Sequence, residues 1–271
     1  MFIVIIVRGV FLVKVGIIGS TGFEFYRICD SYIEKEIIVD LESIKYLSGD
    51  FHGIDIYFFV RNIRKGACPP HSVDYLRIMK AMQLLQVNSI LATSVVGSLR
   101  PEYKPGDHII IDQFLDFTKY RIFTVYNKDE FAFVDFTYPY CNSLRQVLAN
   151  SCEKIGVDYK ESGCYVGVDG PRFETAAEVK AYSILGGDVV GMTNIPEVIL
   201  ARELGLCYAT IALIVNYGAG IEGNLVLRKD CREEVNKHID KTVDIIRNAL
   251  SNIRNREYCD CYLKADDIIT N

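Results

Sequence analysis

Few histidines and little positive charge limit what this chain can bind. Its 271 residues include no tryptophan, only four histidines and only four methionines. Lys and Arg total 30 against 35 Asp and Glu, which gives a formal net charge of −5 and an isoelectric point near 5.5. Proteins that bind nucleic acid usually carry a basic surface. We therefore expect no nucleic acid as a partner.

Long hydrophobic runs are also lacking. The apolar start at residues 1–7 is interrupted by Arg8 and Gly9, too soon for a membrane span of roughly 20 residues. No basic residue precedes this run and no small-residue cleavage site follows it, so a secretory signal peptide is not indicated. These features predict a cytoplasmic protein without a membrane partner, in which residues 1–12 form an extra strand or an N-terminal extension.

The composition suits one large core. Hydrophobic residues make up 50% of the chain and charged residues 24%. Single cores stop growing at about 250 to 300 residues, which is the length of this chain. No repeat, low-complexity tract or linker divides the sequence. We predict a single domain over residues 1–271, with residues 253–271 as a C-terminal tail.

Apolar β-branched runs alternate with helical patterns along the chain. Several runs are apolar throughout, as expected for strands that are covered on both faces. The expected strands lie at 13–18, 54–60, 89–94, 108–111 and 207–215, and the expected helices at about 72–86, 142–155, 175–185, 196–204 and 231–252. This order predicts an α/β fold with a mixed, partly closed central sheet flanked by helices.

Nine cysteines raise the question of a metal site or disulfide bonds. Two of them form the pair Cys259-Asp-Cys261. Zinc sites usually supply four ligands at wider spacing, and no histidine lies near this pair, so we expect no metal. Disulfide bonds and reduced thiols both remain open, with Cys141 and Cys207 as further candidates. The sequence does not indicate which cysteines would pair.

Several ordered segments carry a family resemblance. They are GIIGSTG at 16–22, VGSL at 96–99, PGD at 105–107, DGPRFETAAE at 169–178, GMTNIPE at 191–197 and ALIVN at 212–216. Together they resemble the trimeric purine nucleoside phosphorylase and methylthioadenosine phosphorylase family, over nearly the whole chain. The resemblance implies phosphorolysis, in which inorganic phosphate attacks the anomeric carbon of a purine nucleoside and releases the free base. It implies no metal or organic cofactor, with phosphate as a co-substrate.

The phosphate site implied by the resemblance uses hydroxyls and a backbone amide. Thr21 lies in a glycine-rich turn, where backbone amides can approach an anion. Ser94 and the backbone amide of Val95 match the family segment that faces phosphate. Thr193 completes this set between phosphate and ribose, although it could instead cap a helix.

Arg61 is the strongest cationic candidate for phosphate, because its planar guanidinium donates two parallel hydrogen bonds. The chain departs from the family next to it, since Asn62 and Gly66 stand where related enzymes usually carry histidines. Asn62 can still donate a neutral hydrogen bond. The departure predicts either weaker phosphate binding or recruitment of Arg64 or Lys65.

The base-recognition residues favour a 6-oxopurine. Phe173 can stack on the purine, unless it is an ordinary buried core residue. An ionised Glu174 accepts a hydrogen bond from the N1–H of hypoxanthine or guanine, whereas N1 of neutral adenine offers only a lone pair. Asn216 can donate to O6 and accept from N7–H of the leaving base. By resemblance, oxopurine-type members have this Glu and Asn pair, and adenosine-type members have an aspartate in place of the asparagine.

The sugar contacts are less distinct. Met192 is expected against the ribose, and Tyr217 and Gly218 beside the base. Phe133 occupies a place where related enzymes often have a histidine from the neighbouring subunit, which favours an apolar 5′ group such as methylthio. Arg232 falls near a small apolar position of the family, which argues the other way. Both residues could also have only packing or surface roles.

Three functions follow from these assignments. The first is a 6-oxopurine nucleoside phosphorylase acting on inosine, guanosine or methylthioinosine, with Asn216 and Glu174 in the catalytic roles. The second is a methylthioadenosine phosphorylase, in which water or a protonated Glu174 accommodates adenine. The third is a nucleoside-binding protein without turnover, because Asn62 and Gly66 alter the phosphate loop. Sharing of the site across an interface predicts a homotrimer or a hexamer made of two trimers.

Overall fold

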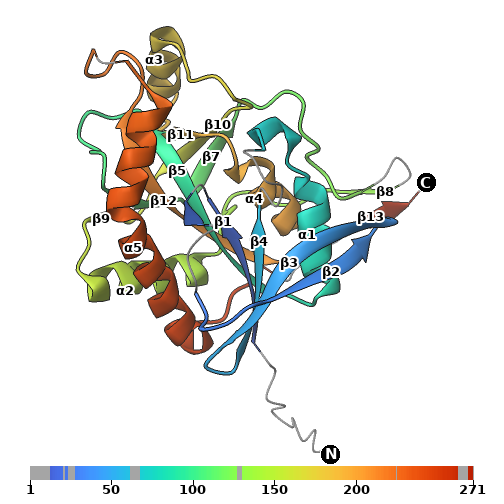
Figure 1. The fold of residues 1–271 in the computed structure, drawn as a ribbon. Helices are drawn as coiled ribbons and strands as arrows, with labels where there is room; N and C mark the ends of the chain where they lie inside the picture. The colour runs from blue at the N-terminus through green and yellow to red at the C-terminus, as the bar shows by residue number, and fades with distance from the viewer. Residues whose placement is uncertain are drawn as a thin grey trace, which may run out of the picture.

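A mixed sheet of 11 strands runs through the centre of the molecule (Figure 1). This computed structural model describes residues 13–20, 22–23, 28–61, 68–126, 130–223, 225–261 and 268–270, so the extension expected at residues 1–12 lies outside the described residues. The strands of the sheet are β1 (Lys14–Gly19), β2 (Ile33–Val39), β3 (Glu42–Phe51), β4 (Ile54–Val60), β5 (Ser89–Ser98), β6 (His108–Ile110), β7 (Gln113–Asp116), β9 (Tyr159–Lys160), β10 (Cys164–Gly167), β11 (Val189–Gly191) and β12 (Cys207–Tyr217).

The sheet branches at β5. This strand is parallel to β1 over residues 89–92 and parallel to β12 over residues 89–98, and it is antiparallel to β11 at residues 97–98. From the branch, one path runs through β1, β4, β3 and β2, and another through β11, β10 and β7, while β12 leads to β6 and β9. The predicted α/β domain with a mixed central sheet is confirmed.

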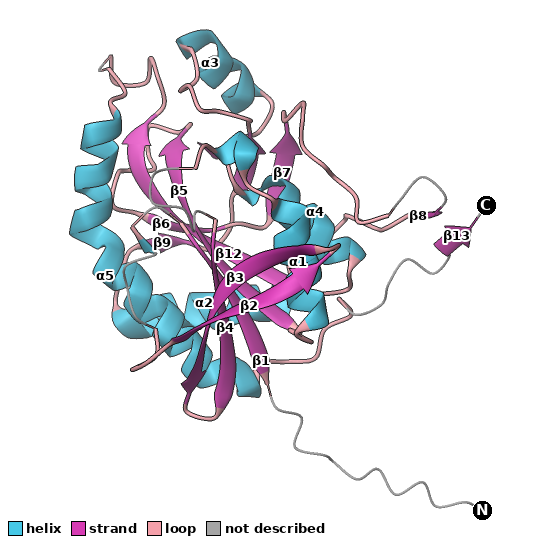
Figure 2. Ribbon diagram, turned by 45° about the vertical axis from the view of Figure 1, so that its right-hand side comes forward, coloured by secondary structure: helices cyan, strands magenta, loops and turns pink. Residues whose placement is uncertain are grey.

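Helices cover both faces of this sheet (Figure 2). On one face, α2 (Asn142–Ile155) and α5 (Arg228–Asn252) pack on the strands, and on the other α1 (Tyr75–Leu84) and α4 (Asn194–Glu203) do so. Alternate residues of β12 enter the two cores: Leu213 packs with α2 and α5, whereas Ala212 and Ile214 pack with α1 and α4. Burial on both faces explains why this strand is apolar throughout.

Local signals fix the helix ends close to where the sequence predicts them. The helix expected at 142–155 has these bounds in α2, and Gly156 follows it at φ +74, the left-handed conformation that favours glycine. Gly205 lies just beyond α4 at φ +68. α3 (Ala176–Ile184) begins at Thr175 with a capping box. The short helices η2 (Pro70–Ser72) and η3 (Ile253–Asn255) precede α1 and follow α5.

The hairpin of β2 and β3 was not among the expected strands. Its exposed face is polar, so the sequence there lacks the continuous apolar run of the central strands. A separate pair of strands, β8 (Glu130–Ala132) and β13 (Ile268–Thr270), is antiparallel, and it brings the C-terminal segment beside residues 130–132. None of the described helices combines the length and the apolar character needed to cross a membrane.

Candidate active site

Most of the predicted site residues lie toward the carboxyl ends of the parallel strands. β4, β1, β5 and β12 run in one direction side by side. Arg61 follows β4, Ser94 and Val95 lie in β5, and Asn216 lies near the end of β12. In open α/β sheets this edge is where ligands usually bind. The order of the strands therefore brings together residues that are far apart in the sequence.

At the phosphate end, hydroxyl groups gather around the end of β1. The hydroxyl of Thr93 accepts from the backbone N–H of Ser20 at 2.9 Å and donates to the Ser20 hydroxyl at 3.1 Å. Ser94 Oγ is buried and meets no partner at hydrogen-bonding geometry within the described residues. Thr193 precedes α4, but its side chain makes no capping hydrogen bond. The hydroxyl of Thr193 is therefore not used to cap α4.

The guanidinium of Arg61 is buried and bound to Glu197 of α4. Nε donates to Oε1 at 2.5 Å and Nη2 donates to Oε2 at 2.7 Å. Nη1 donates to the carbonyl oxygens of Gly19 and Thr93, each at 3.0 Å. Burial disfavours the charged guanidinium, but the Glu197 carboxylate more than offsets this and raises the pKa of Arg61. Four of the five N–H donors are used by these groups, and the fifth is on Nη2.

Five residues of the predicted phosphate site cannot be placed. Thr21, Asn62, Arg64, Lys65 and Gly66 all lie outside the described residues. The role of Thr21 and the consequences of the departure at Asn62 and Gly66 therefore remain predictions.

At the predicted base end, Glu174 lies directly before Thr175, the N-cap residue of α3. Thr175 and Glu178 close the capping box of this helix, and Arg172 donates to the Glu178 carboxylate at 2.7 and 2.8 Å. The cap thus uses Glu178 and not Glu174. Desolvation raises the pKa of Glu174, and the nearby Glu178 charge acts in the same direction, while Arg172 acts in the opposite one.

Two glycines bring α3 against the segment that follows β12. A Cβ atom on Gly220 would lie 2.8 Å from the Cβ of Ala176, the first residue of α3. A Cβ atom on Gly218 would lie 3.0 Å from the side chain of Val179, which is also in α3. Larger residues would separate the two elements. Glu174 lies two residues before α3 and Asn216 lies two residues before Gly218, so both residues lie at the same end of the sheet.

Asn216 is oriented by groups on both sides of its carboxamide. Nδ2 donates to the carbonyl oxygen of Tyr217 at 2.7 Å, and the Cys231 thiol of α5 donates to Oδ1 at 3.6 Å. Gly97 of β5 lies opposite, where a Cβ atom would be 3.2 Å from Nδ2. One N–H and one lone pair of the carboxamide remain for a ligand.

The segment before α3 also presents apolar groups. Phe173 is 38% exposed, so it is not an ordinary buried core residue. Met192 is partly buried between β11 and α4 and packs against Gly170, whose φ is +66. A side chain at residue 170 would overlap the Met192 sulfur. Phe173 thus presents an accessible aromatic ring at one end of segment 170–173, and the thioether of Met192 packs against Gly170 at the other end.

A cavity of about 260 Å³ opens beside the end of β12. Its lining includes three predicted substrate residues: Asn216, Tyr217 and Gly218. Arg232 is exposed on α5 and is not part of this lining. Phe133 is 79% exposed and lies just after β8, in contact with the ring of Phe131. It is accessible to a neighbouring chain.

Comparison with known proteins supports the same assignment. The model of the phosphorylase superfamily matches residues 14–251. The chain belongs to this superfamily. It is 40% identical over 250 residues to the "Probable 6-oxopurine nucleoside phosphorylase" of Dictyoglomus turgidum, covering 92% of this chain and 95% of the relative. It is 39% identical over 255 residues to the 6-oxopurine nucleoside phosphorylase of Pyrococcus furiosus, covering 92% and 96%. The solved structure of methylthioadenosine phosphorylase from Schistosoma mansoni with adenine has a TM-score of 0.86 at 27% identity, covering 90% and 93%.

Some residues that build this phosphorylase site are not evident from the sequence. Glu197 accepts from Tyr208 at 2.7 Å as well as from Arg61, and it is completely buried. Arg121 donates through Nη2 to the carbonyl oxygens of Val168 and Asp169, and through Nη1 to that of Ile195. A charged residue inside the matched segment GMTNIPE was the available signal for Glu197. Nothing local distinguishes Arg121 from a surface arginine.

Proposed function

We propose that this phosphorylase cleaves 6-oxopurine nucleosides, with inorganic phosphate as the second substrate. The products are the free base and ribose 1-phosphate or its 5-methylthio analogue. The observation that carries the proposal is the placement of Glu174 and Asn216 at one end of the sheet, beside an accessible aromatic ring. The relatives named as 6-oxopurine nucleoside phosphorylases support it.

The chemistry of these two side chains suits the keto form of a purine. An ionised Glu174 accepts from N1–H, and the free N–H of Asn216 donates to O6. As the glycosidic bond breaks, N7 of the base gains a proton, and the remaining lone pair of Asn216 Oδ1 accepts from N7–H. Because this hydrogen bond forms only as the base leaves, it favours the transition state over bound substrate. Phe173 stacks on the ring and Met192 contacts the sugar.

Phosphate is the nucleophile, so the protein needs only to position it beneath C1′. The hydroxyls of Ser94 and Thr193, the amide of Val95 and the remaining N–H of Arg61 supply donors, with Thr21 and Asn62 nearby in sequence. Ser94 and Gly97 are three positions apart on β5, or roughly 10 Å. This separates the phosphate end from the base end, where Asn216 faces Gly97. Phosphate also stabilises the positive charge that develops on the ribosyl ring. No step requires a metal or organic cofactor.

The finer assignments are part of the proposal. Phe133 of a neighbouring subunit contacts the 5′ group and favours methylthio, while Arg232 would favour a polar one, so inosine, guanosine and methylthioinosine are all retained. The assembly is a homotrimer or a hexamer, and the location is the cytoplasm.

One observation favours methylthioadenosine phosphorolysis as the second candidate. Desolvation raises the pKa of Glu174, and a protonated carboxyl group would donate to N1 of adenine. The likeness to the Schistosoma mansoni structure points the same way.

The test compares base release from inosine, guanosine, methylthioinosine and methylthioadenosine, with and without phosphate. We expect phosphate-dependent release of hypoxanthine or guanine, faster than release of adenine by a factor of roughly 10 or more. The Glu174→Gln variant serves as the control for base recognition, because an amide keeps the size of the side chain and removes its charge. Release of adenine alone would establish the second candidate. Tight nucleoside binding without any release would indicate a non-catalytic binding protein.

A further inference from the structure

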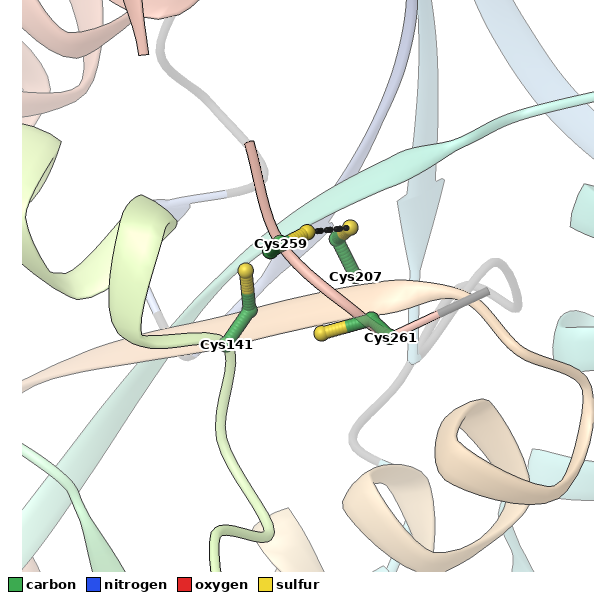
Figure 3. A group of neighbouring side chains, drawn as sticks. All are labelled: Cys141, Cys207, Cys259 and Cys261. Carbon is green, nitrogen blue, oxygen red and sulfur yellow. Dashed lines mark hydrogen bonds between the residues drawn. The ribbon is translucent and has the colours of Figure 1, made fainter. Parts of the chain in front are cut away.

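Four cysteines from three parts of the chain meet in one cluster (Figure 3). Cys141 directly precedes α2, Cys207 begins β12, and the pair of Cys259 and Cys261 follows η3. Their Sγ atoms all lie within 4.8 Å of one another, and the Sγ atoms of Cys207 and Cys259 are 3.3 Å apart. All nine cysteines of the chain have free thiols in this structure. We call these four residues the four-cysteine cluster.

The main chain holds the cluster in place. The backbone N–H of Cys141 donates to the carbonyl oxygen of Tyr208 at 2.9 Å, which connects α2 to β12. The Ser143 hydroxyl donates to the carbonyl oxygen of Glu257 at 2.7 Å, which connects α2 to the C-terminal segment. Three of the four cysteines are buried. The cluster is thus built by packing of the fold, and it is not a chance grouping of mobile surface side chains.

The geometry suits a tetrahedral ion with sulfur ligands. A Zn–S bond of about 2.3 Å places the corners of a tetrahedron about 3.8 Å apart. The observed sulfur positions are compatible with this spacing after small side-chain rotations. A set of four thiolates without carboxylate or imidazole selects zinc over hard cations such as magnesium and calcium. This ligand set was not evident from the sequence, because only Cys259 and Cys261 are close together in it.

The surroundings also suit the charge of such a site. Zinc with four thiolates carries a net charge of −2, which needs compensation when it is buried. Arg256 supplies a positive charge, with Nη1 at 3.9 Å from Cys141 Sγ.

We propose that the four-cysteine cluster binds one zinc ion, which connects the C-terminal segment to α2 and β12. The site is structural and takes no part in the phosphorolysis. β12 is 11 residues long, so its first residue, Cys207, is roughly 30 Å from its other end, where Asn216 lies. Since all four positions of the ion are filled by protein ligands, no position is open for a substrate.

The first experiment measures zinc and thiol state together. The protein is purified anaerobically without chelator or added reductant, and its zinc content and denatured mass are determined. We expect one zinc per chain and a mass in which every cysteine is a thiol. Disulfide bonds within the cluster are the competing chemistry. A mass lower by two hydrogens for each bond, without zinc, would overturn the proposal, as would four free thiols that bind no added zinc.

Variants then test which residues bind the ion. Cys259→Ser and Cys261→Ser should each weaken zinc binding by roughly 10-fold or more, whereas Cys164→Ser, a half-buried cysteine outside the cluster, should not. Cobalt(II) in place of zinc should give the absorption of a tetrahedral four-thiolate site. A chelator should lower the unfolding temperature of the unchanged protein, and added zinc should restore it. An unfolding temperature that does not respond to chelator would contradict a structural role.

Discussion

In the proposed site, Glu174 and Asn216 select the purine, so changing them together should change the substrate. In Asn216→Asp the carboxylate only accepts hydrogen bonds, and in Glu174→Gln the amide can donate to N1 of adenine. We expect the double variant to lose activity on inosine by roughly 10- to 150-fold, because a mismatched hydrogen bond to a charged group costs about 1.5 to 3 kcal/mol. Activity on adenosine or methylthioadenosine should rise relative to inosine.

The ratio of kcat/KM for the two bases checks this prediction. Phe173→Leu serves as the comparison, since it removes stacking but leaves the hydrogen-bonding pair intact. That variant should lower kcat/KM for both substrates by about the same factor. A double variant whose preference for inosine is unchanged would show that other groups read position 6 of the base.

The raised pKa of Glu174 predicts that base preference depends on pH. A raised carboxyl pKa means that the folded protein holds the proton more tightly than the unfolded chain does. The resulting stabilisation is present below the ordinary pKa of 4.5 and is lost as pH rises through the raised value. As pH falls through the same range, the protonated group becomes a weaker acceptor for N1–H and gains a donor for N1 of adenine.

We therefore expect the kcat/KM ratio of inosine to methylthioadenosine to fall as the pH is lowered from neutral toward 4.5. The ratio removes effects of pH that both substrates share, such as phosphate ionisation. In Glu174→Gln the ratio should be flat over the same range. A sloping ratio in that variant would assign the titration to another group.

At the scale of elements, the turn between β2 and β3 contains a position that suits glycine. Asp40 and Leu41 have φ values of +50 and +67, and Leu41 is 98% exposed, so its side chain contributes no packing. A left-handed residue other than glycine costs about 1 to 2 kcal/mol, and glycine loses about 0.5 to 1 kcal/mol more backbone entropy on folding. Leu41→Gly should therefore stabilise the protein by about 0.5 to 1 kcal/mol.

Chemical denaturation measures this difference, and Leu41→Ala is the matched control. Alanine removes the same exposed side chain but keeps the Cβ atom that disfavours positive φ, so no stabilisation is expected. Equal effects of the two variants would mean that the gain comes from removing a surface leucine and not from the backbone.

The same hairpin shows what could be predicted from the sequence. Strands covered on both faces, such as β4 and β12, were predicted because their apolar runs are continuous. β2 was missed because its sequence, IEKEIIV, is largely exposed. Its turn also contains no glycine, which removes the usual hairpin signal. Buried strands could therefore be predicted from their apolar runs, whereas the exposed edge strand could not.

At the site, residues within matched motifs could be predicted, whereas their partners across the fold could not. Asn216 and Glu174 were proposed from residue type and position, and their roles stay predictions. The bonding of Glu197 to Arg61 depends on α4 packing near the end of β4, a contact between residues 136 positions apart. The four-cysteine cluster likewise depends on the register of β12 with α2. Single-sequence patterns contain local periodicity but not such long-range contacts.

For the whole molecule, exposed apolar side chains mark a surface that would suit the interface of the proposed assembly. Within the described residues, large exposed hydrophobic side chains concentrate between 117 and 138: Phe117, Tyr120, Ile122, Phe123, Phe131, Phe133 and Tyr138. Concentrated apolar surface of this kind is typical of a protein interface. The segment also includes β8, which pairs with the C-terminal strand β13. A homotrimer or hexamer would bury it.

Assembly should therefore be required for activity, because Phe133 would complete the site of a neighbouring chain. Light scattering should give three or six times the chain mass of 30.7 kDa, and dilution should reduce activity in step with dissociation.

In the assembled protein, Phe133→Ala should weaken binding of methylthioinosine by roughly 10-fold or more and leave binding of inosine less affected. The reason is that an apolar 5′ group contributes about 1 to 3 kcal/mol in an apolar pocket. Tyr138→Ala, an exposed aromatic of the same segment, is the control. A fully active monomer would refute the shared site, because Phe133 is 79% exposed within its own chain and does not line the cavity there.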